Sequence, residues 1–149
     1  MRPIREPLGR VMMMHPAPKG DLVAVVNHRH ELLVVDTKKR TVKRVDRSEF
    51  APISGIDWSP DGQWLAYDCA DAVHRTCVKL YSVRSRKSVA VTDPVLRDYA
   101  PHFDPKGRYL YFLSAREFNP VYDQIKFELS FPCGIRPYML LVDAAVPHP

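Results

Sequence analysis

Short hydrophobic runs alternate with polar turns along this chain, and one kind of turn recurs three times. These turns begin at Pro18, Pro60 and Pro105, and in each a glycine stands two residues after the proline. The intervals between the three prolines are 42 and 45 residues. Internal periods of roughly 40–50 residues are typical of propeller blades. The recurrence therefore predicts three copies of one structural unit.

Each unit is expected to be a group of short strands around this turn. Proline sets φ for the first turn position and glycine accepts the left-handed conformation that follows, so the turn closes a hairpin. The run after the turn, such as residues 22–25, is apolar on both faces, as expected of a strand packed between two neighbours. The other expected strands span 11–15, 31–36 and 41–45 in the first unit, 56–58, 78–83 and 88–92 in the second, and 100–103 and 137–142 in the third.

This organisation predicts an all-β chain, a β-propeller fragment of about three four-stranded antiparallel blades of WD40-like or TolB-like type. The partial propeller covers residues 1–149, with blades at 8–50, 51–95 and 96–149 and an insertion at 115–135 in the last. An immunoglobulin-type sandwich also has short strands, but it does not predict the same turn three times at blade spacing. A helix longer than a turn or two is expected at most around 122–129.

Two segments carry a resemblance to known families. Residues 58–67, WSPDGQWLAY, resemble the S-P-D-G repeat (PD40) of TolB-type propellers, which also occurs in tricorn-like and prolyl-oligopeptidase-like peptidases. Residues 98–114, DYAPHFDPKGRYLYFLS, with the segment that follows as far as Tyr138, resemble the last part of the second propeller of tricorn-like serine proteases. The resemblance implies a non-catalytic propeller that guides peptides towards or away from a separate catalytic region. None of the family's catalytic residues falls on this chain.

Composition changes this picture only slightly. The chain has 22 Lys and Arg residues against 17 Asp and Glu residues, a formal net charge of +5. The three cysteines do not make a closed disulfide framework, so we expect a cytoplasmic protein, and no apolar run approaches the roughly 20 residues that span a membrane. Basic residues gather at two turns; they are better explained by protection of edge strands than by nucleic-acid binding. They are Lys38, Lys39, Arg40, Lys43, Arg44 and Arg47, and Arg84, Arg86 and Lys87.

No catalytic, cofactor or metal site is predicted. The sequence lacks a G-x-S-x-G elbow, and neither Ser114 nor His102 has a partner that indicates a nucleophile and base. His28, His30 and His74 are expected to be solvated turn residues, because a metal site needs three or four converging ligands. Cys69 and Cys77 could face each other across a hairpin, where we expect reduced thiols.

The insertion at 115–135 is the main departure from the repeat. Long ordered loops in compact folds are usually functional or interfacial. Its aromatic side chains either pack over the blade edge or dock on another domain or subunit. The predicted interaction residues are Phe118, Tyr122, Phe127 and Phe131.

The leading functional hypothesis is a tricorn-like propeller region that acts in substrate gating, domain docking or assembly. The alternative is a free-standing TolB-like propeller that binds a peptide or protein partner. Three blades cannot close a ring, so we expect a head-to-tail homodimer with six blades. Its interfaces are expected to include Val23 and Val25 on the first blade and Leu110 and Phe112 on the third.

Overall fold

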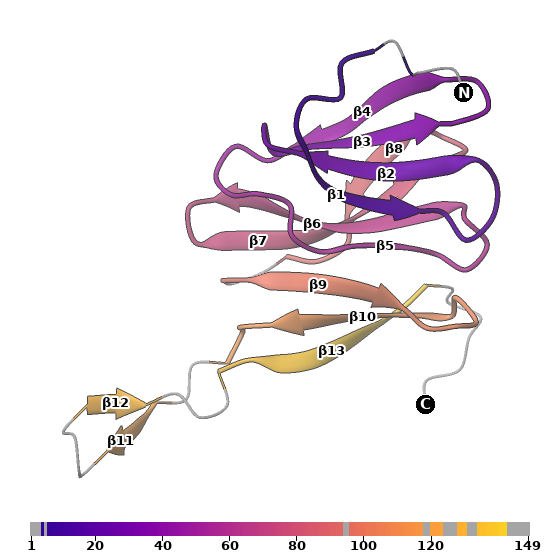
Figure 1. Ribbon diagram of the computed structural model, residues 1–149. Helices are drawn as coiled ribbons and strands as arrows, with labels where there is room; N and C mark the ends of the chain where they lie inside the picture. Colours follow the sequence, from indigo (N-terminus) through magenta and orange to yellow (C-terminus); the bar gives the residue numbers. More distant parts are fainter. Residues whose placement is uncertain are drawn as a thin grey trace.

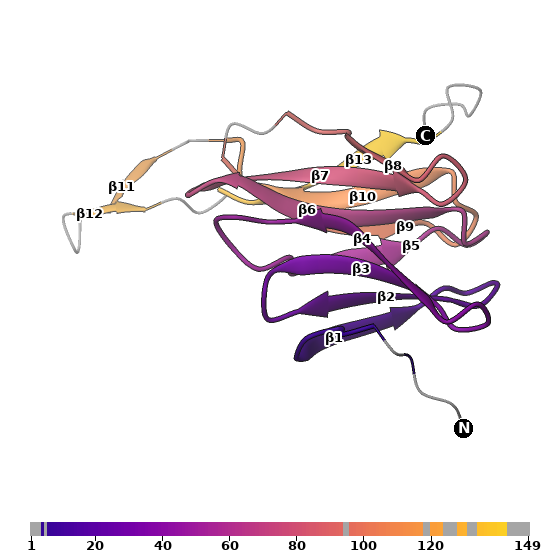
Figure 2. The same ribbon diagram turned by 90° about the horizontal axis from the view of Figure 1, so that it is seen from above.

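The computed structural model of the chain consists of antiparallel β-sheets arranged as successive layers (Figures 1 and 2). The structure describes residue 4 and residues 6–93, 96–117, 120–123, 128–130 and 134–142. No helix within these ranges is long and apolar enough to cross a membrane.

Each of the first two sheets is a four-stranded meander, in which consecutive strands pair. Blade 1 contains β1 (Val11–Pro16), β2 (Leu22–Asn27), β3 (Glu31–Asp36) and β4 (Thr41–Arg47). Blade 2 contains β5 (Ile56–Trp58), β6 (Trp64–Ala72), β7 (Arg75–Ser82) and β8 (Lys87–Ala90). The two blades lie face to face (Figure 1). Both have the same four-stranded antiparallel order, which confirms the repeat that the sequence predicts.

Blade 3 has three strands among the described residues, in the order β9–β10–β13. They are β9 (Asp98–Phe103), β10 (Tyr109–Ser114) and β13 (Arg136–Leu141). Between β10 and β13 the chain forms a separate two-stranded ribbon of β11 (Val121–Asp123) and β12 (Glu128–Ser130), in which Tyr122 pairs with Leu129. The helix considered around 122–129 is therefore wrong, because the described residues at both ends of that stretch are paired strands.

The recurring turns have the conformation expected from their glycines. Gly20, Gly62 and Gly107 have φ of 86°, 71° and 69°, which is the left-handed region. The Gly62 amide donates to the Ser59 carbonyl at 2.8 Å and the Gly107 amide to the Asp104 carbonyl at 2.9 Å. The same type of turn thus leads into β2, β6 and β10, and it sets the register of the hairpin in each of the three blades.

Two apolar interfaces hold the blades together. Side chains that alternate along each central strand project to opposite faces, so β6 contributes to both interfaces. Blade 1 meets blade 2 through a cluster that includes Ala24, Val26, Leu32, Trp58, Leu65 and Tyr67. Blade 2 meets blade 3 through Ala66, Val78, Phe103, Leu110 and Phe112. The strands after the turns are therefore buried on both faces where they lie between blades, as predicted.

The open faces differ from the sequence-based expectation. Leu110 and Phe112 are 1% and 4% exposed because they point towards blade 2, so their predicted place on the outer face of blade 3 is wrong. The outer face carries the alternate residues of β10, among them Tyr111, which is 42% exposed. On blade 1, Val23 and Val25 do face outward. Ile4 and Leu8 cover part of that face, and Val25 is only 1% exposed.

Candidate interaction surfaces

The first strands of the three blades are joined by hydrogen bonds between side chains and backbone. Trp58 Nε1 donates to the His15 carbonyl oxygen at 2.9 Å, which links blade 2 to blade 1. The Phe103 amide donates to Asp57 Oδ2 at 2.8 Å, and His102 Nδ1 lies 3.0 Å from the same oxygen, which links blade 3 to blade 2. His15, Asp57 and His102 each stand three residues before the proline of their turn, so both links between blades use equivalent positions.

The Asp68 carboxylate ties blade 2 to blade 3 at a buried position. Asp68 is 2% exposed and accepts from the Ser54 amide at 2.8 Å and the Ser54 hydroxyl at 2.9 Å. The Ala100 amide donates to Asp68 Oδ2 at 3.4 Å. Gly55 passes so close that a Cβ added there would lie 2.7 Å from Asp68 Oδ2 and 2.9 Å from the Ala100 Cα. The backbone before β5, the Asp68 side chain on β6 and the backbone of β9 therefore fit together only with glycine at position 55.

A polar cluster joins blade 1 to blade 2 near their outer strands. The Lys79 ammonium on β7 lies 2.8 Å from Asp46 Oδ2 on β4, and the Tyr67 hydroxyl donates to the same oxygen at 2.8 Å. Burial opposes ionisation of Asp46, but the hydrogen bonds from Lys79 and Tyr67 outweigh it and lower its pKa. Burial is also the main cause that raises the pKa of Tyr67, which keeps the phenol protonated.

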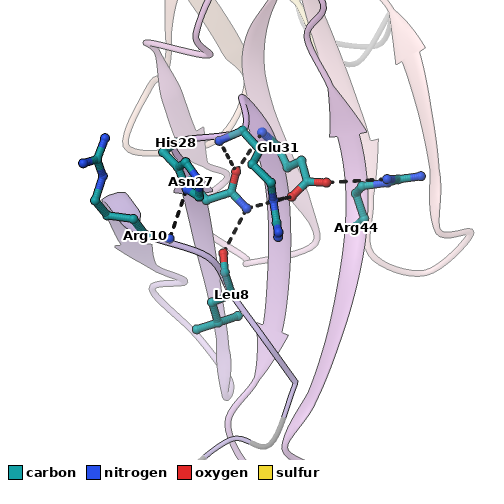
Figure 3. Close-up of polar contacts among 7 residues, drawn as sticks. Leu8, Arg10, Asn27, His28, Glu31 and Arg44 are labelled. Atoms are coloured by element: carbon teal, nitrogen blue, oxygen red, sulfur yellow. Dashed lines mark hydrogen bonds and ion pairs between the residues drawn. The ribbon is translucent and has the colours of Figure 1, made fainter.

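The H-x-H pair of residues 28–30 has a structural explanation at the β2–β3 turn (Figure 3). His28 Nδ1 accepts from the Arg10 amide at 3.1 Å. Asn27, 1% exposed, donates to the Leu8 carbonyl at 2.9 Å and to Glu31 Oε2 at 2.7 Å, so the turn fastens the segment before β1. No group of three or more His, Cys, Asp or Glu side chains that could hold a metal occurs among the described residues.

The Glu31 carboxylate completes the cluster in Figure 3. It forms ion pairs with Arg29 at 2.9 Å and with Arg44 at 3.5 Å. The hydrogen bond from Asn27 is the largest cause that lowers the pKa of Glu31, and burial opposes it. The acid is therefore ionised at neutral pH and holds two of the basic side chains of blade 1 by charge. His30 stands in the same turn with a φ of 59°.

The two cysteines of blade 2 are direct partners across the β6–β7 hairpin. Cys69 pairs with Cys77 in the strand register, and both are buried free thiols. Cys77 Sγ donates to the Cys69 carbonyl oxygen at 3.5 Å. Burial raises the pKa of Cys69 to about 11 and that of Cys77 above its usual range. The sequence analysis considered that they could face each other across the hairpin, and the strand register confirms that placement.

The ribbon of β11 and β12 projects away from the three blades (Figure 1). Tyr122 and Val121 are 56% and 53% exposed. The other three predicted interaction residues, Phe118, Phe127 and Phe131, lie outside the described residues. The sequence therefore identified the segment that departs from the blade repeat, and its role in interaction stays a prediction.

The base of the ribbon is held by charged and aromatic side chains. Asp98 is completely buried, forms an ion pair with Arg116 and accepts a hydrogen bond from the Ser114 hydroxyl. The Arg116 guanidinium lies 5.3 Å from the centroid of the Tyr138 ring. On the other side, Arg136 pairs with Glu117 at 2.9 Å. These contacts fix the points where the ribbon leaves β10 and enters β13. The Ser114 hydroxyl takes part in them as a structural hydrogen-bond donor to Asp98.

The comparisons with known proteins agree with this geometry. Residues 2–149 match the family described as the tricorn protease second beta propeller domain. The putative Tricorn-like protease C-terminal subunit of Sulfurisphaera tokodaii is 37% identical over 135 residues, which is 91% of this chain and 16% of the relative. Tricorn protease homolog 1 of Streptomyces coelicolor is 39% identical over 142 residues, 95% of this chain and 13% of the relative.

Solved structures show the same relationship. The crystal structure of the tricorn protease superposes with a TM-score of 0.87 at 28% identity and covers 97% of this chain and 15% of that one. A putative TolB from Agrobacterium tumefaciens shares the fold, with a TM-score of 0.59 at 19% identity. The matched part is a small fraction of each tricorn relative, and it coincides with the blades described above. The chain belongs to the tricorn protease family and contains blades of its second β-propeller domain.

Proposed function

We propose that these blades are a non-catalytic propeller region of a tricorn-type peptidase and act in substrate gating, domain docking or assembly. The observation that carries this proposal is the pair of apolar end faces. Met12 and Met14 are each 64% exposed on blade 1, and Tyr111 and Leu141 are 42% and 38% exposed on blade 3. Large exposed apolar side chains that gather on one face are typical of surfaces that meet a partner.

A non-catalytic role is also supported by the serine chemistry. Ser114, the last residue of β10, is 1% exposed and bonds to Asp98 and Arg116. No serine hydroxyl among the described residues hydrogen-bonds to a histidine. An activated nucleophile needs such a base. The free thiols of Cys69 and Cys77 support the cytoplasmic location that we propose for the protein.

A chimera tests the role in the peptidase. In tricorn protease homolog 1 of Streptomyces coelicolor, the 142 matching residues are replaced by this chain. We expect the chimera to assemble and to hydrolyse long and short peptides, whereas Leu141→Glu in it disturbs assembly or changes the ratio of long-peptide to short-peptide hydrolysis. Unchanged assembly and an unchanged ratio in a folded Leu141→Glu chimera would contradict the proposal. So would peptide hydrolysis by the isolated chain that one serine substitution abolishes.

The second candidate is a free-standing TolB-like propeller that binds a peptide or protein partner. For either candidate we also propose that two copies meet head to tail, so that the end face of blade 1 covers the end face of blade 3 in a six-bladed ring. The exposed Met12 and Met14 favour it, because a neighbouring blade would bury them against apolar surface. Ile4 and Leu8 would have to pack between the copies or move aside. Light scattering tests the dimer: a stable folded monomer at micromolar concentration excludes it.

A further inference from the structure

A cleft of about 490 Å³ opens between blades 1 and 2, beside the β3–β4 and β7–β8 turns. We call it the interblade cleft. Its charged lining consists of Lys39, Lys43 and Arg86 with one carboxylate, Asp36. Apolar side chains, among them Val34, line most of the rest of the cleft, together with Thr41 and Tyr81. Its volume falls in the range of roughly 300–1,000 Å³ that is typical of ligand sites.

Two of the three cations in the interblade cleft have no carboxylate partner among the described residues. Lys39 pairs with Asp36, with 3.7 Å between its ammonium and Oδ2. Lys43 Nζ instead donates to the Arg86 carbonyl oxygen at 3.3 Å and lies 6.0 Å from the centroid of the Tyr81 ring. No hydrogen bond or ion pair of the Arg86 guanidinium is found within the described part of the chain. The cleft therefore holds an excess of positive charge where two blades meet.

Tyr81 brings a hydroxyl donor to the interblade cleft. The residue is 3% exposed and lines the interblade cleft. Its hydroxyl forms no hydrogen bond with any described residue and is not fully enclosed, so it opens onto the interblade cleft. Burial raises the pKa of Tyr81 and the Arg86 charge opposes that rise, so the hydroxyl stays protonated and can donate. The Tyr81 hydroxyl and two cations that have no carboxylate partner thus line the same cleft.

We propose that the interblade cleft binds an acidic peptide segment, which places a carboxylate between Lys43, Arg86 and Tyr81. The carboxylate accepts from all three groups, which suits its several lone pairs. An apolar side chain next to that acid packs against Val34 and Val83. This mixed lining favours a peptide over a phosphate backbone, which has no apolar group to bury here. The inference does not depend on the role proposed above.

Fluorescence anisotropy tests the proposal on the full chain. The probe is a fluorescein-labelled eight-residue peptide of alternating glutamate and leucine, compared with the same peptide carrying glutamine for glutamate. We expect the glutamate peptide to bind at least about tenfold more tightly, because hydrogen bonds to charged groups are the stronger ones. Lys43→Met and Arg86→Asn should each weaken binding about tenfold, and Tyr81→Phe about fivefold. Asparagine is chosen because Arg86 has a φ of 58°, which asparagine tolerates.

Lys38→Met and Arg84→Met are the matched controls. Both residues lie in the same two turns and are exposed, but neither lines the interblade cleft, so the affinity should not change. Equal affinity for the glutamate and glutamine peptides would overturn the proposal. Tighter binding of a thymidine octanucleotide that the same three substitutions weaken would replace the peptide with a phosphate backbone. Amide chemical shifts of the unaltered protein give a second readout, and shifts confined to another surface would also refute the proposed site.

Discussion

Removal of the Lys79 ammonium tests whether the polar cluster between blades 1 and 2 contributes to stability. Lys79→Met keeps most of the apolar stem and deletes the charge that lies 2.8 Å from Asp46 Oδ2. Tyr67 still donates to the same oxygen, so the carboxylate keeps one hydrogen bond in the variant. The substitution therefore isolates the contribution of the ion pair from that of the surrounding packing.

The partial burial of the pair sets the expected magnitude. The Lys79 and Asp46 side chains are 24% and 22% exposed, between a surface pair and a fully buried one. Surface pairs contribute up to about 1 kcal/mol, whereas removal of one partner from a buried pair costs about 3–5 kcal/mol. Methionine also removes the cost of burying the ammonium, so we expect a loss of about 2 kcal/mol. For a chain of this size that corresponds to a fall in Tm of about 4–8 °C.

The unaltered protein and Lys79→Met differ in their free energy of unfolding, and the pH dependence of this difference follows from the directions of the two pKa shifts. The pKa of Asp46 is lowered from 3.8, so its contribution is present above that value and is lost as the pH falls through the lower folded pKa. The pKa of Lys79 is raised from 10.5, so its contribution is present below that value and is lost as the pH rises through the higher folded pKa. The difference in free energy of unfolding between the unaltered protein and Lys79→Met should stay constant from about pH 5 to pH 9.

Urea unfolding at several pH values, followed by circular dichroism, measures this difference. Lys87→Met on β8 is the matched control, because Lys87 is exposed and no ion pair is found for it among the described residues. The control should change the free energy of unfolding by less than about 0.5 kcal/mol. Our reasoning is refuted if Lys79→Met costs no more than the control, or if its cost varies with pH across the plateau.

Two further predictions concern blade 2. Gly55→Ala should destabilise the protein by about 1–3 kcal/mol in the same urea assay, because its Cβ would lie 2.7 Å from Asp68 Oδ2 and 2.9 Å from the Ala100 Cα; unchanged stability would mean that the backbone relaxes freely. Cys69 and Cys77 should react with iodoacetamide at pH 7 only after unfolding, since both are buried and their pKa values are raised; peptide mapping by mass spectrometry that finds rapid labelling of either in the native protein would contradict this.

The sequence by itself determined the repeat and the strands. The spacing of Pro18, Pro60 and Pro105 predicts the three units, and the positive φ of each following glycine explains why that turn can be recognised locally. Strand positions follow from the same local signals, since the strands 31–36 and 56–58 were predicted with the bounds that the structure has. The resemblance of residues 98–114 to tricorn-like proteases also rests on the sequence alone, and the family match confirms it.

Only the tertiary structure decided which face each side chain occupies. A strand that is apolar on both faces has no polar residues to mark its outward side, so the sequence could not tell that Leu110 and Phe112 point to blade 2. Contacts between blades depend on how the sheets stack. The approach of Lys43 to Tyr81 and Arg86, about forty residues away in the sequence, therefore emerges only when blades 1 and 2 pack face to face.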